Sequence, residues 1–125
     1  MRHIEDALQK SCVNWFSYQY VEYAKLLHHS PNGGKRNAIE AAKFKAMGVR
    51  AGFPDLILCI ARHGYHGLFV ELKTATGKQS EKQKYYQYVL EEQGYKYVVI
   101  RTLEDFINVI NDYLNDYSTN DRGSI

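Results

Sequence analysis

The apolar residues of this chain follow two different spacings, and together these predict its elements. Helical spacing predicts helices over residues 3–18 and 36–47, a third from Ser80 to Gly94, and a last one around residues 106–113. Short apolar runs predict strands over residues 24–29, 55–61, 65–73 and 96–100. The order is helix, strand, helix, hairpin, helix, strand, helix. It predicts an α/β protein with a mixed central sheet flanked by helices.

The predicted hairpin is the feature that brings charged residues together. If its midpoint falls at His63, Asp55 faces Glu71, and Gly64 takes the left-handed position of a three-residue loop. Side chains alternate along a strand, so Asp55, Glu71 and Lys73 share one face with apolar neighbours. The other face carries only apolar residues, which are Leu56, Leu58, Ile60, Leu68, Val70 and Leu72. We therefore expect both faces of the sheet to be covered.

Two carboxylates and one ammonium at the end of an apolar surface need compensation, because an unpaired buried ion costs several kcal/mol. One interpretation is a salt bridge from Lys73 to Glu71 or Asp55. The other is a divalent cation held by the two acids, with Lys73 facing the reacting group. The three residues alone leave both interpretations open.

Several separated blocks, in order, give the chain a family resemblance. Pro54-Asp55 with Glu71-x-Lys73 resembles the PD-(D/E)XK nuclease signature, and the surrounding sequence resembles the VRR-NUC group of that superfamily. The further blocks are Glu5-x-x-x-Gln9, Pro31-Asn32-Gly33-Gly34-Lys35-Arg36, Gly48-x-x-x-Gly52-x-Pro54-Asp55-Leu56, Gly77, Ser80-x-x-Gln83 and Gly94. The resemblance spans residues 5 to 101 and implies a restriction-endonuclease-like core.

The resemblance also implies a function. It points to a metal-dependent, structure-selective DNA endonuclease, above all one that resolves Holliday junctions and leaves 5′-phosphate ends. Stand-alone phage and bacterial VRR-NUC proteins resemble resolvases that work as symmetric dimers, so a homodimer on branched or junction DNA is expected. The cofactor would be Mg²⁺ or Mn²⁺, bound by Asp55, Glu71 and the Leu72 carbonyl, with Lys73 orienting the nucleophile or stabilising charge.

Two further residues have both a structural and a catalytic interpretation. Glu5 lies in the first turn of a helix, where an acid is favourable against the helix dipole, and the resemblance gives it a role in supporting the metal site. Gln83 follows Ser80 by three residues, which is a capping box. The resemblance places the same glutamine beside the metal.

Basic residues near glycines are candidates for DNA contact. Asn32, Lys35 and Arg36 surround two glycines whose backbone amides suit phosphate, although a plain turn explains the same residues. Arg50 and Lys78, which flank the two acidic motifs, are the other candidates. No array of arginine or asparagine is arranged for reading bases, so recognition through backbone and shape is expected.

Composition limits these interpretations without deciding among them. The 125 residues suit one domain, expected over residues 1–117, with a disordered tail over 118–125. The net charge is only +2, with basic residues between 33 and 50 and acidic ones after 102. Charge alone favours ordinary solvated helix faces. The 11 tyrosines suit half-exposed interfaces.

Cysteine usage and the lack of any targeting segment predict a cytoplasmic protein, in a bacterium or a phage-infected host. Cys12 and Cys59 fall at apolar positions and are expected to be buried free thiols in a reducing compartment. No apolar run is long enough to span a membrane.

Two other functions compete with cleavage of DNA. The first is a module of the same fold that binds branched DNA or a partner nuclease without cutting. The second is a metal phosphoesterase acting on nucleotides, which would need a closed pocket instead of an open groove.

Overall fold

The protein is built on a four-stranded mixed sheet between helical layers, which confirms the predicted fold class. The computed structural model describes residues 2–31 and 37–115. The strands are β1 (Leu27–His29), β2 (Leu56–Leu58), β3 (Leu68–Leu72) and β4 (Lys96–Ile100), and they lie side by side in the order β1-β2-β3-β4. The pairs β1–β2 and β2–β3 are antiparallel, and the pair β3–β4 is parallel.

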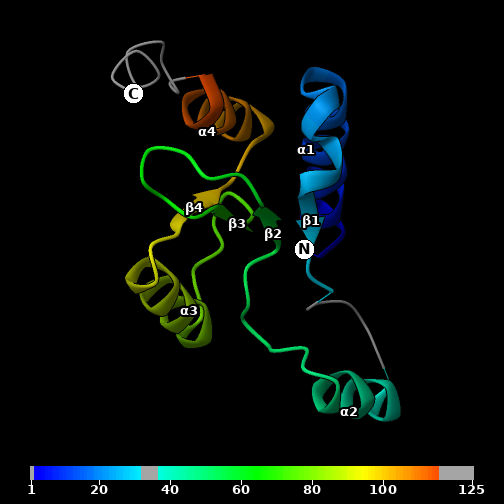
Figure 1. Ribbon diagram of the computed structural model, residues 1–125. Helices are drawn as coiled ribbons and strands as arrows, with labels where there is room; N and C mark the ends of the chain where they lie inside the picture. The colour runs from blue at the N-terminus through cyan, green and yellow to red at the C-terminus, as the bar shows by residue number, and fades with distance from the viewer. Residues whose placement is uncertain (1, 32–36, 116–125) are drawn as a thin grey trace.

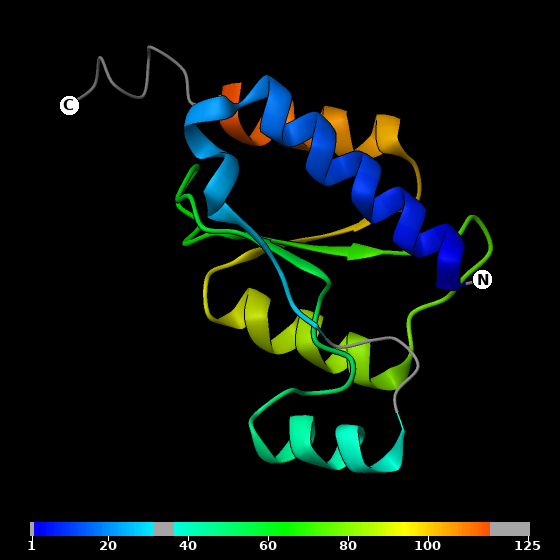
Figure 2. The same cartoon turned by 90° about the vertical axis from the view of Figure 1, so that its right-hand side faces the viewer.

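Helices cover both faces of this sheet (Figures 1 and 2). On one face lie α1 (Arg2–Gln19) and α4 (Leu103–Asn115), and on the other lies α3 (Glu81–Glu92). The core between the sheet and the helix pair α1/α4 contains the apolar face predicted for the hairpin. Cys12 and Phe16 of α1 and Phe106 and Ile110 of α4 are completely buried against it. This burial is the main stabilising contribution to the fold.

The hairpin has the predicted register but shorter strands and a different turn. Leu56 pairs with Val70, so Asp55 stands opposite Glu71 as expected. The predicted three-residue loop is wrong. His63 and Gly64 both have positive φ, 54° and 83°, between a bridged Arg62 and Tyr65, which makes a two-residue turn.

The strands are short because the two arms of the hairpin separate before the turn. The Cys59 amide donates to the Leu26 carbonyl at 2.9 Å, and the His66 amide donates to the Gly94 carbonyl at 2.9 Å. Each arm therefore bonds to the neighbour on its outer side. Cys59 is exposed, so its predicted burial is wrong, whereas Cys12 is buried as expected.

Two predictions near the N-terminal half need correction. The strand expected over residues 24–29 is only Leu27–His29, because a 3-10 helix, η1 (Val21–Leu26), continues from α1. The second helix, α2, is Ala38–Ala46, with the Asn37 side chain accepting from the Glu40 amide. None of its residues is buried, and Ile39 is 82% exposed. Figures 1 and 2 show α2 standing apart from the sheet.

The elements around the third helix form as predicted because their signals are local. Ser80 caps α3, its hydroxyl accepting from the Gln83 amide, and the Gln83 side chain accepts from the Ser80 amide. Gly94, with φ of 91°, follows the end of α3, and β4 spans the predicted residues. The predicted tail, residues 118–125, lies outside the described residues.

Candidate active site

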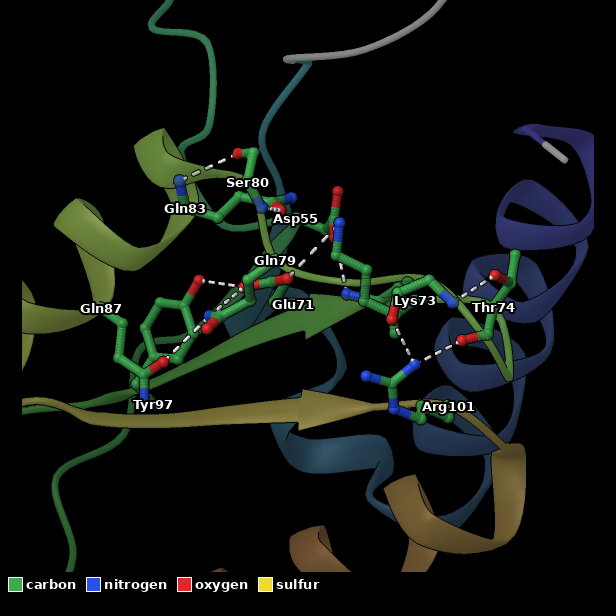
Figure 3. Close-up of polar contacts among 12 residues, drawn as sticks. Asp55, Glu71, Lys73, Thr74, Gln79, Ser80, Gln83, Gln87, Tyr97 and Arg101 are labelled. Carbon is green, nitrogen blue, oxygen red and sulfur yellow. Dashed lines mark hydrogen bonds and ion pairs between the residues drawn. The ribbon is translucent and has the colours of Figure 1, made fainter.

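The end of the β2–β3 hairpin brings Asp55, Glu71 and Lys73 together (Figure 3). The Leu72 amide donates to Asp55 Oδ2 at 2.7 Å, which ties the start of β2 to the end of β3. Lys73 Nζ lies 3.7 Å from Glu71 Oε2. The Lys73 amide donates to the Ile100 carbonyl, so the residue leaves β3 still attached to β4. The three residues of the acidic motifs therefore form one cluster, as the hairpin register predicts.

Glu71 is the most buried charged residue of this cluster. Its side chain is fully buried, and all its hydrogen bonds are on one oxygen. Oε1 accepts from the Tyr97 hydroxyl at 2.6 Å and from Gln79 Nε2 at 2.9 Å. Among the residues that the structure describes, Oε2 is buried without a hydrogen-bond partner, and the Lys73 ammonium lies 3.7 Å from it. A buried carboxylate oxygen in this state is unfavourable on its own and favourable beside a cation.

Asp55 is held in an environment that disfavours its charge. Burial is the main cause that raises the pKa of Asp55, to about 6, and the negative charges of Glu5 and Glu71 raise it further. The hydrogen bond from the Leu72 amide and the nearby His29 act in the opposite direction. Three acids thus repel one another here, which a bound divalent cation would relieve.

The electrostatic effect of Glu5 on Asp55 shows that the first helix reaches the site. Glu5 is half-buried in the first turn of α1. The core residues of α1 pack on the sheet face opposite to the one that carries Asp55 and Glu71. Glu5 fits both interpretations given above, since an acid in this turn also favours the helix. His29 was not predicted for the site. Its Nδ1 lies 3.1 Å from the Asp55 carbonyl, at the end of β1.

The Gln83 side chain forms part of the N-terminal cap of α3. Its Oε1 accepts from the Ser80 amide at 2.8 Å, which is the capping role expected from the sequence. The glutamine that contacts Glu71 is Gln79, in the loop before α3. No sequence signal marked Gln79. The sequence did not mark Tyr97 either, because its place near Glu71 depends on the pairing of β4 with the distant strand β3.

The loop before Asp55 packs closely against the start of α3. Gly52 has φ of 85°, and a Cβ there would lie 2.6 Å from Lys82 Cβ and 3.1 Å from the Lys82 carbonyl carbon. Phe53 packs edge-to-face on Phe69 and Tyr86, and Pro54 is buried. The close approach therefore fixes the chain that enters the active site.

The loop after Lys73 is held by Arg101, which the sequence also did not single out. Arg101 Nη1 donates to the carbonyls of Thr74 at 2.6 Å and Gly77 at 2.7 Å (Figure 3). This clamp positions Lys78 at the exposed end of the loop. Because Arg101 follows β4 directly, the end of β4 helps to order the segment that carries Lys73.

The candidate DNA contacts are only partly described. Arg50 is exposed and donates from Nη1 to the Lys45 carbonyl at the end of α2, at 3.1 Å. Lys78 is exposed near the site. Asn32, Lys35 and Arg36 lie outside the described residues, so their predicted role stays a prediction.

Within residues 2–31 and 37–115, no three His, Cys, Asp or Glu side chains gather closely enough to hold a metal by themselves. A cation at the hairpin end would therefore need ligands of another kind, such as a backbone carbonyl or water. In the same residues, no helix is long and apolar enough to cross a membrane.

The comparisons agree with one another. The VRR-NUC domain family matches residues 2–103 of the chain. A solved structure of a "VRR_NUC domain protein" is 39% identical, has a TM-score of 0.77, and covers 89% of this chain and 88% of its own. No curated protein matches.

Proposed function

Because the chain belongs to the VRR-NUC domain family, a nuclease-type family, we propose that it is a divalent-metal-dependent DNA endonuclease. It would hydrolyse phosphodiester bonds at the Asp55, Glu71 and Lys73 cluster and leave 5′-phosphate ends. The observation that carries the proposal is the Glu71 carboxylate, which is fully buried and whose Oε2 has no hydrogen-bond partner among the described residues, 3.7 Å from the Lys73 ammonium.

The residues present fit a Mg²⁺ or Mn²⁺ ion. Carboxylate and carbonyl oxygens are the ligands that these hard cations prefer. Asp55, Glu71 through Oε2, and the Leu72 carbonyl would hold the ion, and Glu5 would act through water or help to hold a second one. When bound, the ion supplies a more acidic water and neutralises charge on the phosphate.

The chain's own residues perform the remaining tasks. Lys73 is a partly exposed cation at the edge of a buried site, with 13% of its side chain exposed. From there its ammonium can donate to the attacking water or to a phosphate oxygen and stabilise charge that builds on the pentavalent phosphorus. Gln83, at the start of α3, is proposed to assist beside the metal.

We propose branched DNA, in particular a four-way junction, as the substrate, with a homodimer as the active form. A junction has two equivalent strands to cut, and each chain supplies one Asp55–Glu71–Lys73 set, so two-fold symmetry would match them. Exposed Arg50 and Lys78 are suited to phosphate contacts, and Asn32, Lys35 and Arg36 are proposed to join them. We propose that the protein acts in the cytoplasm.

One observation favours a second function. The Lys73 to Glu71 ion pair at 3.7 Å is also what a purely structural salt bridge would give. On that interpretation the protein binds branched DNA or a partner nuclease without cutting.

Incubating the protein with a labelled four-way junction, a flap and a duplex, in Mg²⁺, Mn²⁺ or EDTA, tests the proposal. Symmetric metal-dependent nicks in the junction are expected. Binding without cleavage would support the second function, and turnover of nucleotides alone would indicate a phosphoesterase. Lys73→Ala should abolish cutting and keep junction binding, whereas Lys25→Ala, on exposed η1, should cut normally. Loss of both cutting and binding in Lys73→Ala would make Lys73 structural.

A further inference from the structure

The two oxygens of the Glu71 carboxylate are in unlike surroundings. Oε1 accepts two hydrogen bonds, from Tyr97 and Gln79, while Oε2 accepts none. Both donors are neutral, and both are part of the fold around the site (Figure 3). Hydrogen bonds to a carboxylate are strong, so together they restrict rotation of the Glu71 side chain.

Tyr97 reaches Glu71 because of the sheet register. In the parallel pair β3–β4, Tyr97 lies beside Phe69, and Glu71 follows Phe69 by two residues on the same face. The Tyr97 residue is buried, and its hydroxyl lies 2.6 Å from Oε1. A phenol hydroxyl at this distance from an ionised carboxylate oxygen, which has no proton of its own, is the donor of the pair.

The amide of Gln79 is oriented by a chain of side chains along α3. Its Nε2 donates to Glu71 Oε1 and to Gln87 Oε1, each at 2.9 Å, and Gln87 Nε2 donates to Glu91 Oε2 at 3.3 Å. A flipped Gln79 would place its carbonyl oxygen against two acceptors. The chain therefore keeps a donor pointed at Glu71.

This inference rests on the proposed function. We infer that Tyr97 and Gln79 are positioning residues, which occupy Glu71 Oε1 so that Oε2 alone is offered to a divalent cation. A carboxylate fixed in this way binds through one oxygen. That mode suits the small octahedral ions Mg²⁺ and Mn²⁺, whereas Ca²⁺ also accepts carboxylates through both oxygens.

Removing a positioning donor should therefore change the affinity for the ion and the selectivity among ions. Loss of a partner behind a metal ligand typically lowers metal affinity by about 10- to 100-fold. In Tyr97→Phe, Glu71 keeps one donor on Oε1 and is freer to rotate. We expect the Mn²⁺ affinity to fall about tenfold, while the Ca²⁺ affinity changes less because a rotated carboxylate can bind Ca²⁺ through both oxygens.

Calorimetric titration of the full chain with Mn²⁺ alone and Ca²⁺ alone tests this. The variants are Tyr97→Phe and Gln79→Leu, and the latter, in a loop, keeps the test valid if the former does not fold. The matched control is Tyr95→Phe, because Tyr95 is a half-buried tyrosine whose ring contacts His66 and Phe69 instead of Glu71. Unfolding temperatures in EDTA verify that each variant is folded.

The outcomes separate the inference from the proposed function. A lower ratio of Mn²⁺ to Ca²⁺ affinity in both variants, with Tyr95→Phe unchanged, supports the positioning role. Unchanged affinities, or equal losses for both ions, overturn it, and the proposed nuclease function stands if the wild type still binds Mn²⁺ and cuts. No Mn²⁺ binding by the wild type would overturn both.

Discussion

Asp55 is a residue whose ionisation opposes the stability of the folded protein. Burial, together with the charges of Glu5 and Glu71, raises its pKa to about 6, from an ordinary value of 3.8. The folded state therefore favours the protonated carboxyl, and ionisation above that pKa is unfavourable to folding. A group kept in such a position is typical of functional sites, where a ligand supplies the missing charge.

Asp55→Asn should stabilise the metal-free protein at neutral pH. Because the pKa of Asp55 is raised in the folded state, its ionisation does not destabilise the wild type below about pH 4. The wild type loses stability as the pH rises from about 4 to 6, and the loss persists at higher pH. At about 1.4 kcal/mol per pKa unit, the variant should be more stable by roughly 2 to 3 kcal/mol at pH 7.5, and equal at pH 3.5.

Urea unfolding in EDTA across this pH range would check the difference. Asp112→Asn, which removes an exposed carboxylate of α4, is the control and should change stability by less than about 0.5 kcal/mol at any pH. A variant less stable than the wild type at pH 7.5 would contradict the account of Asp55.

At the scale of elements, the site depends on a loop that approaches a helix closely. Gly52 and Gly48 both have positive φ, 85° and 106°, but only Gly52 has atoms nearby, namely those of Lys82 and Gln83 at the start of α3. Comparing alanine substitutions at the two glycines therefore separates the cost of backbone strain from the cost of steric contact within one loop.

Gly52→Ala should destabilise the protein more than Gly48→Ala does. A left-handed alanine costs about 1 kcal/mol at either position, and at Gly52 the added Cβ would also meet Lys82 Cβ at 2.6 Å. We expect a loss of about 2 to 3 kcal/mol in Gly52→Ala, with weaker cutting because Asp55 follows the displaced loop. Chemical unfolding of both variants measures the gap, and equal losses would show that the contact with α3 is unimportant.

Elements with local signals could be predicted from the sequence, and contacts between distant segments could not. The hairpin register follows from its midpoint, and Ser80 with Gln83 defines the α3 cap within four residues. Tyr97 reaches Glu71 only once β4 has paired with β3, and Gln79 reaches it from the loop that precedes α3. The exposed Cys59 and α2 also depend on tertiary packing, because apolar character alone does not show which face is covered.

At the scale of the whole molecule, exposed apolar side chains are consistent with the proposed homodimer. Tyr18, Tyr85 and Tyr88 are 87%, 61% and 66% exposed, and Ile39 of α2 and Met47, which follows α2, are also exposed. Side chains of this kind are enriched at protein interfaces. Tyr85 and Tyr88 share α3, whereas Tyr18 lies on α1 and Ile39 on α2, so these side chains do not define a single contact surface.

Size-exclusion chromatography with light scattering tests the dimer directly. We expect a mass twice the 14.5 kDa of one chain at micromolar concentration, with or without Mg²⁺. A mass of one chain, together with symmetric cutting of a junction, would show that the dimer forms only on DNA or is unnecessary.

The most direct test of the central claim is the anomalous scattering of a crystal soaked in Mn²⁺. We predict an anomalous peak between Asp55 and Glu71 Oε2, close to the Leu72 carbonyl, that is absent from a Glu71→Gln crystal soaked in the same way. A wild-type crystal with no peak at this position, and with Lys73 still paired to Glu71, would contradict the account.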